Sequence, residues 1–179
     1  PFLYERVGHE RRISARRGIT MNVNVLRSES TGSIHIKSAD PAEPPAIRFN
    51  FLSARADRDG VLAAIRKGRE LMATSPLKEM TGEEIAPGAS LQSDEEILEW
   101  VRNNAETTYH PVGTCKMGND PMAVVDPELR VRGIEGLRVA DASIMPTLTS
   151  GNTNAPCIMI GEKCAAMVLA AAGQERRAA

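Results

Sequence analysis

The sequence has 179 residues, of which 42% are hydrophobic and 25% charged, and its formal net charge is −1. A chain of this length and composition can bury the core of a globular domain, and the balanced charge argues against an electrostatic nucleic-acid interface. No apolar run approaches the length expected of a membrane-spanning helix, and the first residues do not resemble a signal peptide.

The first part of the chain carries only weak patterns. Residues 1–17 show no periodicity and are predicted to form a loop, in which His9 has no catalytic neighbours. The basic side chains of this loop are predicted to be solvated rather than to form an anion or targeting site: Arg11, Arg12, Arg16 and Arg17.

Two alternating segments follow this loop. Residues 18–27 and 33–37 alternate apolar and polar side chains, which predicts two half-buried strands. The turn at 28–32 between them predicts an antiparallel hairpin, and the alternation places His35 on its solvent face.

The middle of the chain is predicted to be mainly helical. After a short strand at 46–49, apolar spacing predicts a helix over residues 57–74. Gly60 and Gly68 each weaken such a helix by about 1 kcal/mol relative to alanine, unless they permit close packing against the sheet. Ser93 with Glu96 is a capping box that begins a second helix after a loop at 79–92.

The last elements are predicted to be two short strands, at 129–131 and 137–140, and a helix from about 153 to 172. Asn152 or Thr153 caps this helix, Pro156 fits its first turn, and Gly173 ends it. Strands followed by separate helices favour an α+β fold, with an antiparallel sheet and flanking helices.

The cysteines are predicted to be free thiols of a cytoplasmic protein, with peripheral membrane association as the alternative location. Cys115, Cys157 and Cys164 lack the spacing of a disulfide framework. A zinc site that combines them with His110 is disfavoured because the sequence contains no C-x2-C pair. We therefore expect no metal site, and thiols that pack as small apolar groups.

Three segments carry the side chains suited to a reaction site: YHPVGTCKMG at 109–118, LRVADASIMP at 137–146 and SGNTNAP at 150–156. They place a histidine on a loop, an aspartate at the end of a strand and asparagines at the start of a helix. Loops held by a rigid scaffold are where catalytic groups usually lie. In this order and spacing, the segments resemble the C-terminal signature of the glucose–methanol–choline (GMC) oxidoreductases, closest to the choline-dehydrogenase-like branch. The resemblance extends from about Gly18 to the last helix.

The resemblance implies an FAD-dependent oxidation of an alcohol to an aldehyde. A hydride must pass to an acceptor such as flavin, since no side chain can take one, and the proton needs a base such as imidazole. His110 matches the family's catalytic histidine, and Asn154 matches its second active-site residue, which is asparagine or histidine in different members. The alternatives are a histidine that only packs in its loop and an asparagine that only caps a helix.

The resemblance also implies contacts with FAD. Asp141 and Ala142 lie in the D-A-S region that touches the flavin cofactor in the family. Asn152 and Thr153 lie at the start of the last helix, whose positive dipole end would face the flavin. For Asp141 the alternative is an aspartate that only shapes a turn.

The implied domain organisation divides the chain near residue 108. Residues 1–108 would belong to the substrate domain, and residues 109–179 would form a strand–loop–helix segment that completes the FAD-binding domain. The sequence contains no G-x-G-x-x-G after a strand, so we expect the N-terminal flavin-binding part to lie elsewhere in a longer enzyme.

The predicted function is thus the C-terminal part of an FAD-dependent alcohol dehydrogenase or oxidase that is inactive alone. Its partners would be a small alcohol, the flavin domain and an electron acceptor, either oxygen or a quinone. The alternative is a non-catalytic binding or structural fragment with the same fold.

Overall fold

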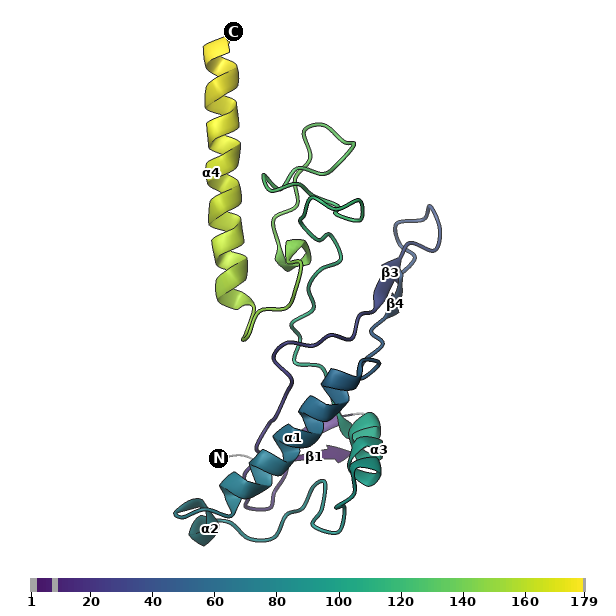
Figure 1. Cartoon of the computed structure of the whole chain (residues 1–179), viewed down its shortest axis with the longest axis vertical. Coiled ribbons are helices and arrows are strands. Elements are labelled where there is room, and N and C mark those ends of the chain that lie inside the picture. Colours follow the sequence, from purple (N-terminus) through teal and green to yellow (C-terminus); the bar gives the residue numbers. More distant parts are fainter. Residues whose placement is uncertain (1–2, 8–9, 179) are drawn as a thin grey trace. The chain divides into compact units, whose positions relative to one another are not determined.

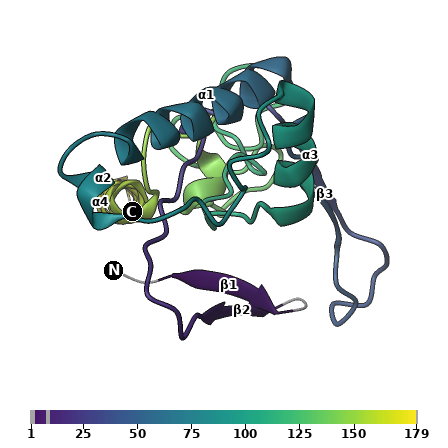
Figure 2. The ribbon, with the colours of Figure 1, turned by 90° about the horizontal axis from the view of Figure 1, so that it is seen from below.

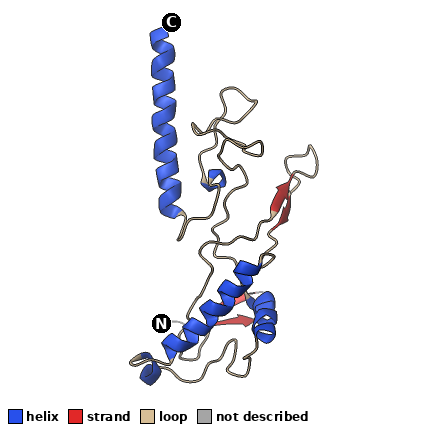
Figure 3. Ribbon diagram, in the orientation of Figure 1, coloured by secondary structure: helices blue, strands red, loops and turns tan. Residues whose placement is uncertain are grey.

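The computed structural model describes residues 3–7 and 10–178, which divide into two compact units. Unit 1 comprises residues 1–25 and 51–106, and unit 2 comprises residues 26–50 and 107–179. Short antiparallel strand pairs and separate helices make up the described chain, so the predicted α+β class is confirmed (Figure 1, Figure 3). The elements, in chain order, are β1 (Tyr4–Val7), β2 (Glu10–Ile13), β3 (Ser33–His35), β4 (Ala46–Arg48), α1 (Arg55–Met72), α2 (Leu77–Met80), α3 (Asp94–Asn104), the 3-10 helix η1 (Ala142–Ile144) and α4 (Asn154–Ala178).

The loop predicted for residues 1–17 is wrong, because β1 and β2 form an antiparallel pair with Tyr4 opposite Ile13 (Figure 2). The pair is closed by a backbone bond of 2.8 Å from Ser14 N–H to the Leu3 carbonyl. Charged side chains occupy most of both strands, so the segment lacks the apolar alternation by which strands are recognised in a sequence. The ladder forms through backbone pairing instead. His9 lies outside the described residues.

The strand predicted for residues 18–27 does not form, and no described strand pairs with this segment. Its apolar side chains pack along α1 instead. A Cβ added to Gly60 would lie 3.2 Å from Val25 Cγ2, and one added to Gly68 would lie 3.2 Å from Met21 Sδ. The alternation therefore reflects contact with a helix, and the two glycines permit that close approach.

Strand β3 pairs with β4, with Ile34 opposite Ile47, so the hairpin predicted between residues 18–27 and 33–37 is wrong. The predicted strand at 46–49 is confirmed as β4, and His35 is exposed as predicted. The predicted half-burial of residues 33–37 is wrong, because Ile34 and Ile36 are exposed as well. Gly32 is required here because its Cβ would lie only 1.9 Å from the Arg48 carbonyl oxygen.

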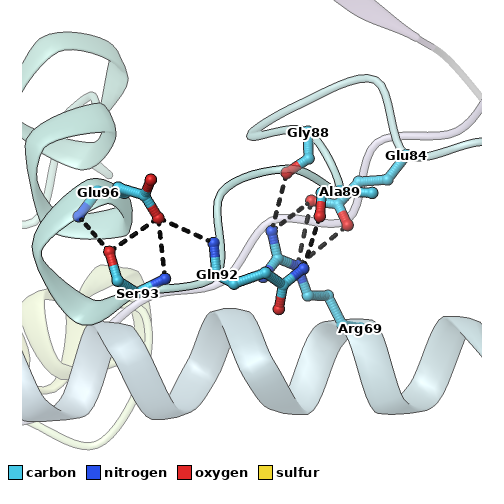
Figure 4. A network of polar contacts seen from close by, with 7 residues as sticks. All are labelled: Arg69, Glu84, Gly88, Ala89, Gln92, Ser93 and Glu96. Carbon is cyan, nitrogen blue, oxygen red and sulfur yellow. Dashed lines mark hydrogen bonds and ion pairs between the residues drawn. The ribbon is translucent and has the colours of Figure 1, made fainter.

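The core of unit 1 forms between α1 and α3, where Leu62 and Ile65 pack with Ile97 and Val101. The predicted capping box is confirmed. Ser93 Oγ accepts the Glu96 N–H, and the Glu96 carboxylate accepts the Ser93 N–H at 3.0 Å (Figure 4).

Arg69 interrupts the apolar stripe of α1 because it has polar partners within unit 1. Its guanidinium binds the Glu84 carboxylate and, at 3.1 Å, the Gly88 carbonyl (Figure 4). Both partners lie in the segment 79–92, which was predicted to be a loop, and Arg69 anchors this loop to α1. The short helix α2, near the start of the loop, was not predicted.

The core of unit 2 joins α4 to the loops that precede it. Its buried members are Val125, Leu129, Ile144, Met145, Ile160 and Cys164. The strands predicted at 129–131 and 137–140 are wrong, because the described residues there form only isolated bridges, such as Arg130 with Arg138. Tight turns at Gly133 and Gly136, both with positive φ, leave too few residues for a ladder.

Helix α4 is longer than predicted and continues through Gly173 to Ala178. The expectation that no apolar run reaches the length of a membrane-spanning helix is also wrong, because residues 154–173 have the length and composition to cross a bilayer. Little of this stretch is buried within the chain. Its exposed large apolar side chains are Ile158, Met159, Val168 and Leu169.

The Asp126 carboxylate organises the turn that inserts Leu129 into this core. It accepts the backbone N–H groups of Glu128 and Arg130, both at 2.9 Å, and the Arg130 guanidinium at 2.8 Å. Leu129 is buried although its φ of 65° is unfavourable for a leucine. Burial raises the pKa of Asp126, but the bonds from Arg130 outweigh it and hold the pKa below its ordinary value.

Replacing Asp126 with asparagine should lower the free energy of unfolding by about 1–3 kcal/mol at neutral pH, because charge-assisted bonds are lost. A carboxyl whose pKa is lower in the folded state stabilises it above the unfolded-state pKa, and this contribution disappears as the pH falls through the folded-state pKa. Urea unfolding at neutral and acidic pH should therefore show the difference between wild type and Asp126→Asn shrinking in acid. Glu128→Gln, which removes a neighbouring exposed carboxylate, is the control; an equal effect from both variants would contradict this account.

Candidate active site

His110 lies in a loop whose backbone is tightly constrained. Tyr109, directly before it, has a φ of 61°, a left-handed conformation that is uncommon for a non-glycine residue. Its N–H donates to Thr107 Oγ1 at 3.0 Å. Gly113 has a φ of 90°, and a Cβ there would lie 3.3 Å from the Met145 carbonyl oxygen. A side chain at 113 would thus be both strained and crowded, so the loop shape depends on this glycine.

The three signature segments converge on one scaffold in unit 2. The Cys115 N–H donates to the Ser143 carbonyl at 2.9 Å, and the Met117 N–H donates to the Ile144 carbonyl at 2.7 Å. These bonds hold the loop after His110 against η1. Ile144 in turn belongs to the same buried cluster as Ile160 of α4, so the histidine loop, the aspartate segment and the last helix share one core.

The central contact of the site joins His110 to Thr153. His110 Nδ1 lies 2.8 Å from Thr153 Oγ1, and the Thr153 backbone N–H faces the same nitrogen with an N···N distance of 3.5 Å. Thr153 is 7% exposed and His110 is half-buried. The first bond is short and well within hydrogen-bonding range, whereas the second is at the long limit. His110 is therefore held through Nδ1.

Helix α4 brings Asn154 next to this contact. The Cys157 N–H donates to the Thr153 carbonyl at 2.9 Å, and the helix begins at Asn154, so Thr153 is in the N-cap position. Asn154 is then the first helical residue rather than the cap, and both it and Asn152 are exposed. The fold thus joins His110 to the start of α4 and leaves two amide side chains accessible there.

Asp141 has a local structural role. Its Oδ1 accepts the Ser143 N–H at 2.7 Å and caps η1, while the residue remains exposed. This geometry is that of an aspartate that shapes a turn, which was the alternative to a flavin contact. Ala142 packs against the core of unit 2. Contact of Asp141 and Ala142 with a flavin stays a prediction.

Two of the three cysteines contribute to the core of unit 2. Cys164 is buried and Cys157 packs against the same cluster, as expected of small apolar groups. Within residues 3–7 and 10–178, no three histidine, cysteine or acidic side chains are grouped closely enough to hold a metal ion.

Two features of the site were not predicted from the sequence. The first feature is the contact of Thr153 with His110. The sequence did contain one indication of it, because Pro156 has no N–H to donate to the hydroxyl of an N-cap residue. The other feature is Arg27, whose guanidinium donates to Ser150 Oγ in the loop before α4. A contact between residues so distant in sequence leaves no local pattern.

Comparison with known proteins gives a consistent picture. The family profile described as GMC oxidoreductase matches residues 28–161. Oxygen-dependent choline dehydrogenase from Escherichia coli O127:H6 is 54% identical over 151 residues, which cover 84% of this chain and 27% of that protein. The chain therefore spans about a quarter of the length of this relative.

Solved structures agree with the sequence comparison. Pyridoxine 4-oxidase from Mesorbium loti has a TM-score of 0.74 at 34% identity and matches 78% of this chain and 27% of its own. A fungal aryl-alcohol oxidase has a TM-score of 0.70 at 36% identity and matches 76% of this chain and 23% of its own. Formate oxidase from Aspergillus oryzae RIB40, whose FAD modification was studied, has a TM-score of 0.72 at 34% identity, with 78% and 25% matched.

Proposed function

This chain belongs to the GMC oxidoreductase family, and we propose that it supplies catalytic residues to an FAD-dependent enzyme that oxidises an alcohol to an aldehyde. The observation that carries the proposal is the His110–Thr153 contact at the start of α4, next to an exposed Asn154. It gives a half-buried imidazole and an amide that can both donate and accept hydrogen bonds.

In the proposed reaction, the alcohol oxygen binds between His110 and Asn154. If Nδ1–H of His110 donates to Thr153 Oγ1, the neutral ring has its lone pair on Nε2, which can then take the hydroxyl proton. The Asn154 amide orients the same oxygen without changing its own charge. Bound FAD would supply the hydride acceptor, which side chains cannot provide.

The residues around the start of α4 fit one side of a flavin. Asn152 and Asn154 offer exposed amides, and Gly151 has no heavy atom within 4 Å of its Cβ position, so a ring could approach closely. The Ala155 backbone N–H near the positive end of the helix could stabilise negative charge on a ligand. These features support contacts of FAD with Asn152 and Thr153, whereas contacts with Asp141 and Ala142 rest on the family resemblance alone.

The exposed apolar side chains of α4 fit the same proposal. In the complete enzyme, a flavin domain would cover Ile158, Met159, Val168 and Leu169, since apolar surface of this kind is usually buried by a partner. We therefore favour a helix covered by protein over one that spans a membrane, in a cytoplasmic enzyme. Residues 1–108 would contribute to the substrate domain and residues 109–179 to the flavin domain. In the structure, however, residues 26–50 belong to the same compact unit as residues 107–179.

Asn154→Ala should slow flavin reduction, whereas Asn154→His should retain part of the rate, because an imidazole can also bind the substrate oxygen. The measurement is anaerobic stopped-flow reduction of the flavin in a chimera. In this chimera, our chain replaces the matching C-terminal segment of Escherichia coli choline dehydrogenase. Asn104→Ala, at an exposed amide of α3 that is not assigned to the site, tests whether the effect is specific to position 154. Equal inactivity of Asn154→Ala and Asn154→His would refute the proposed interchangeability.

Choline is the substrate for the test because the chimera retains the rest of the choline dehydrogenase. We expect the chimera to bind FAD and to be reduced by choline. The electron acceptor, oxygen or a quinone, is then identified by following reoxidation with each. A chimera that binds FAD and folds, but is not reduced by choline, would support a structural role for this chain.

A further inference from the structure

The hydroxyl of Thr153 does not serve the role that its position usually gives it. An N-cap threonine normally accepts the backbone N–H of the second or third helical residue. The third residue of α4 is Pro156, which has no N–H. Of the two usual capping partners only the Ala155 N–H therefore remains, and the Thr153 hydroxyl lies 2.8 Å from His110 Nδ1.

This contact joins two loops that are 43 residues apart in the sequence. Thr153 is buried, its carbonyl accepts the first helical bond of α4, and its hydroxyl reaches the imidazole. The position of the ring thus depends on the position of the helix. When Nδ1 carries the hydrogen and donates it to Thr153 Oγ1, the neutral ring has its lone pair on Nε2, and the 3.5 Å approach of the Thr153 N–H to Nδ1 is then a contact rather than a bond.

We propose that Thr153 is a positioning residue that engages Nδ1 of His110 and reserves Nε2 for the substrate oxygen. The proposal rests on the proposed function for its chemical meaning, but the contact itself can be tested without catalysis. It differs from the prediction that Thr153 contacts FAD, because here the hydroxyl acts through the histidine. Pro156 contributes by removing one of the two N–H groups that could compete for this hydroxyl.

The first test measures the His110 ring in the full chain by nitrogen NMR, at a pH where the ring is neutral. The wild-type ring should be mainly the Nδ1–H tautomer, because this tautomer donates to Thr153 Oγ1 and keeps the lone pair on Nε2. Thr153→Ser should preserve this state, and Thr153→Val, which has the same shape but no hydroxyl, should give a mixture. Thr74→Val in unit 1 is the control substitution. A wild-type ring that already populates both tautomers equally, or a Thr153→Val ring identical to wild type, would overturn the proposal.

The second test uses the chimera loaded with FAD. Thr153→Val should lower the limiting rate of flavin reduction by about tenfold, less than the roughly 10²–10⁴-fold expected on losing the base itself. The choline concentration that gives half the limiting rate should change little. Thr153→Ser should restore most of the rate. Loss of flavin in Thr153→Val with an unchanged His110 ring would instead support direct cofactor contact and contradict positioning.

The two tests separate this proposal from the proposed function. If His110→Ala is reduced as fast as the unmodified chimera, the catalytic role of His110 fails, whatever the tautomer of its ring. If His110→Ala is slow but Thr153→Val has the unmodified rate and ring spectrum, only the positioning role fails.

Discussion

Replacing His110 with alanine in the FAD-loaded chimera should slow reduction of the flavin by choline about 10²–10⁴-fold, the usual contribution of a positioned acid or base. The substitution removes the imidazole that the contact with Thr153 holds near the start of α4. Thr153 and Asn154 remain, so the substrate oxygen could still be oriented but would lose its proton acceptor. Anaerobic stopped-flow absorbance at the flavin band measures the rate directly.

The control for this prediction is His35→Ala. His35 is an exposed strand residue in the same unit, so its loss removes an imidazole of similar chemistry away from the site. It should leave the rate within a few-fold of the unmodified chimera. A rate for His110→Ala in that same range would exclude His110 as the proton acceptor.

The isolated chain should retain no FAD after desalting and should oxidise no alcohol. FAD-binding folds usually hold the pyrophosphate at a glycine turn that begins a helix, with an acidic residue for the ribose, and the sequence has no such unit. The residues near Asp141 and the start of α4 would cover one side of the cofactor. Binding must also offset several kcal/mol of lost translational and rotational freedom, which a half-site does poorly.

This prediction has a second observable. The exposed apolar side chains of α4 should make the isolated chain self-associate, so light scattering should show species larger than one chain. Leu169→Lys on the exposed face should reduce this association. Stoichiometric FAD that survives desalting, with a flavin spectrum bleached by alcohol, would show that the chain is self-sufficient.

The sequence predicted most helices well because their signals are local. The capping box of Ser93 and Glu96 fixed the start of α3, and helical spacing located α1 within two residues of each end. The fold class also followed from the order of strands and helices. In each case the determining contacts lie within a few residues of one another, so a single chain segment carries the signal.

Strand pairing could not be predicted in the same way. The alternation in residues 18–27 is real, but a two-residue period cannot distinguish packing on a sheet from packing along α1. The charged strands β1 and β2 lack that period and pair through their backbones. Short bridges near Gly133 and Gly136 likewise depend on turns that the pattern of apolar residues does not record.

The site was predicted from family resemblance, and its internal geometry came only from the structure. The motifs identified His110 and Asn154 as candidates, but they did not show that Thr153 contacts the His110 ring. That contact depends on the packing of the histidine loop against η1 and α4. Such packing joins residues distant in sequence, so only three-dimensional coordinates could show which neighbour holds the imidazole.

The most direct test of the central claim is anaerobic reduction of the FAD-loaded chimera by choline, compared with its parent choline dehydrogenase and with its His110→Ala variant. Because this chain provides the only segment in which chimera and parent differ, the comparison reports on its residues. We predict that choline bleaches the flavin of the chimera and that His110→Ala loses this reaction while retaining its FAD. A folded, FAD-loaded chimera whose spectrum choline leaves unchanged, beside a parent that is fully bleached, would contradict the claim that this chain supplies catalytic residues.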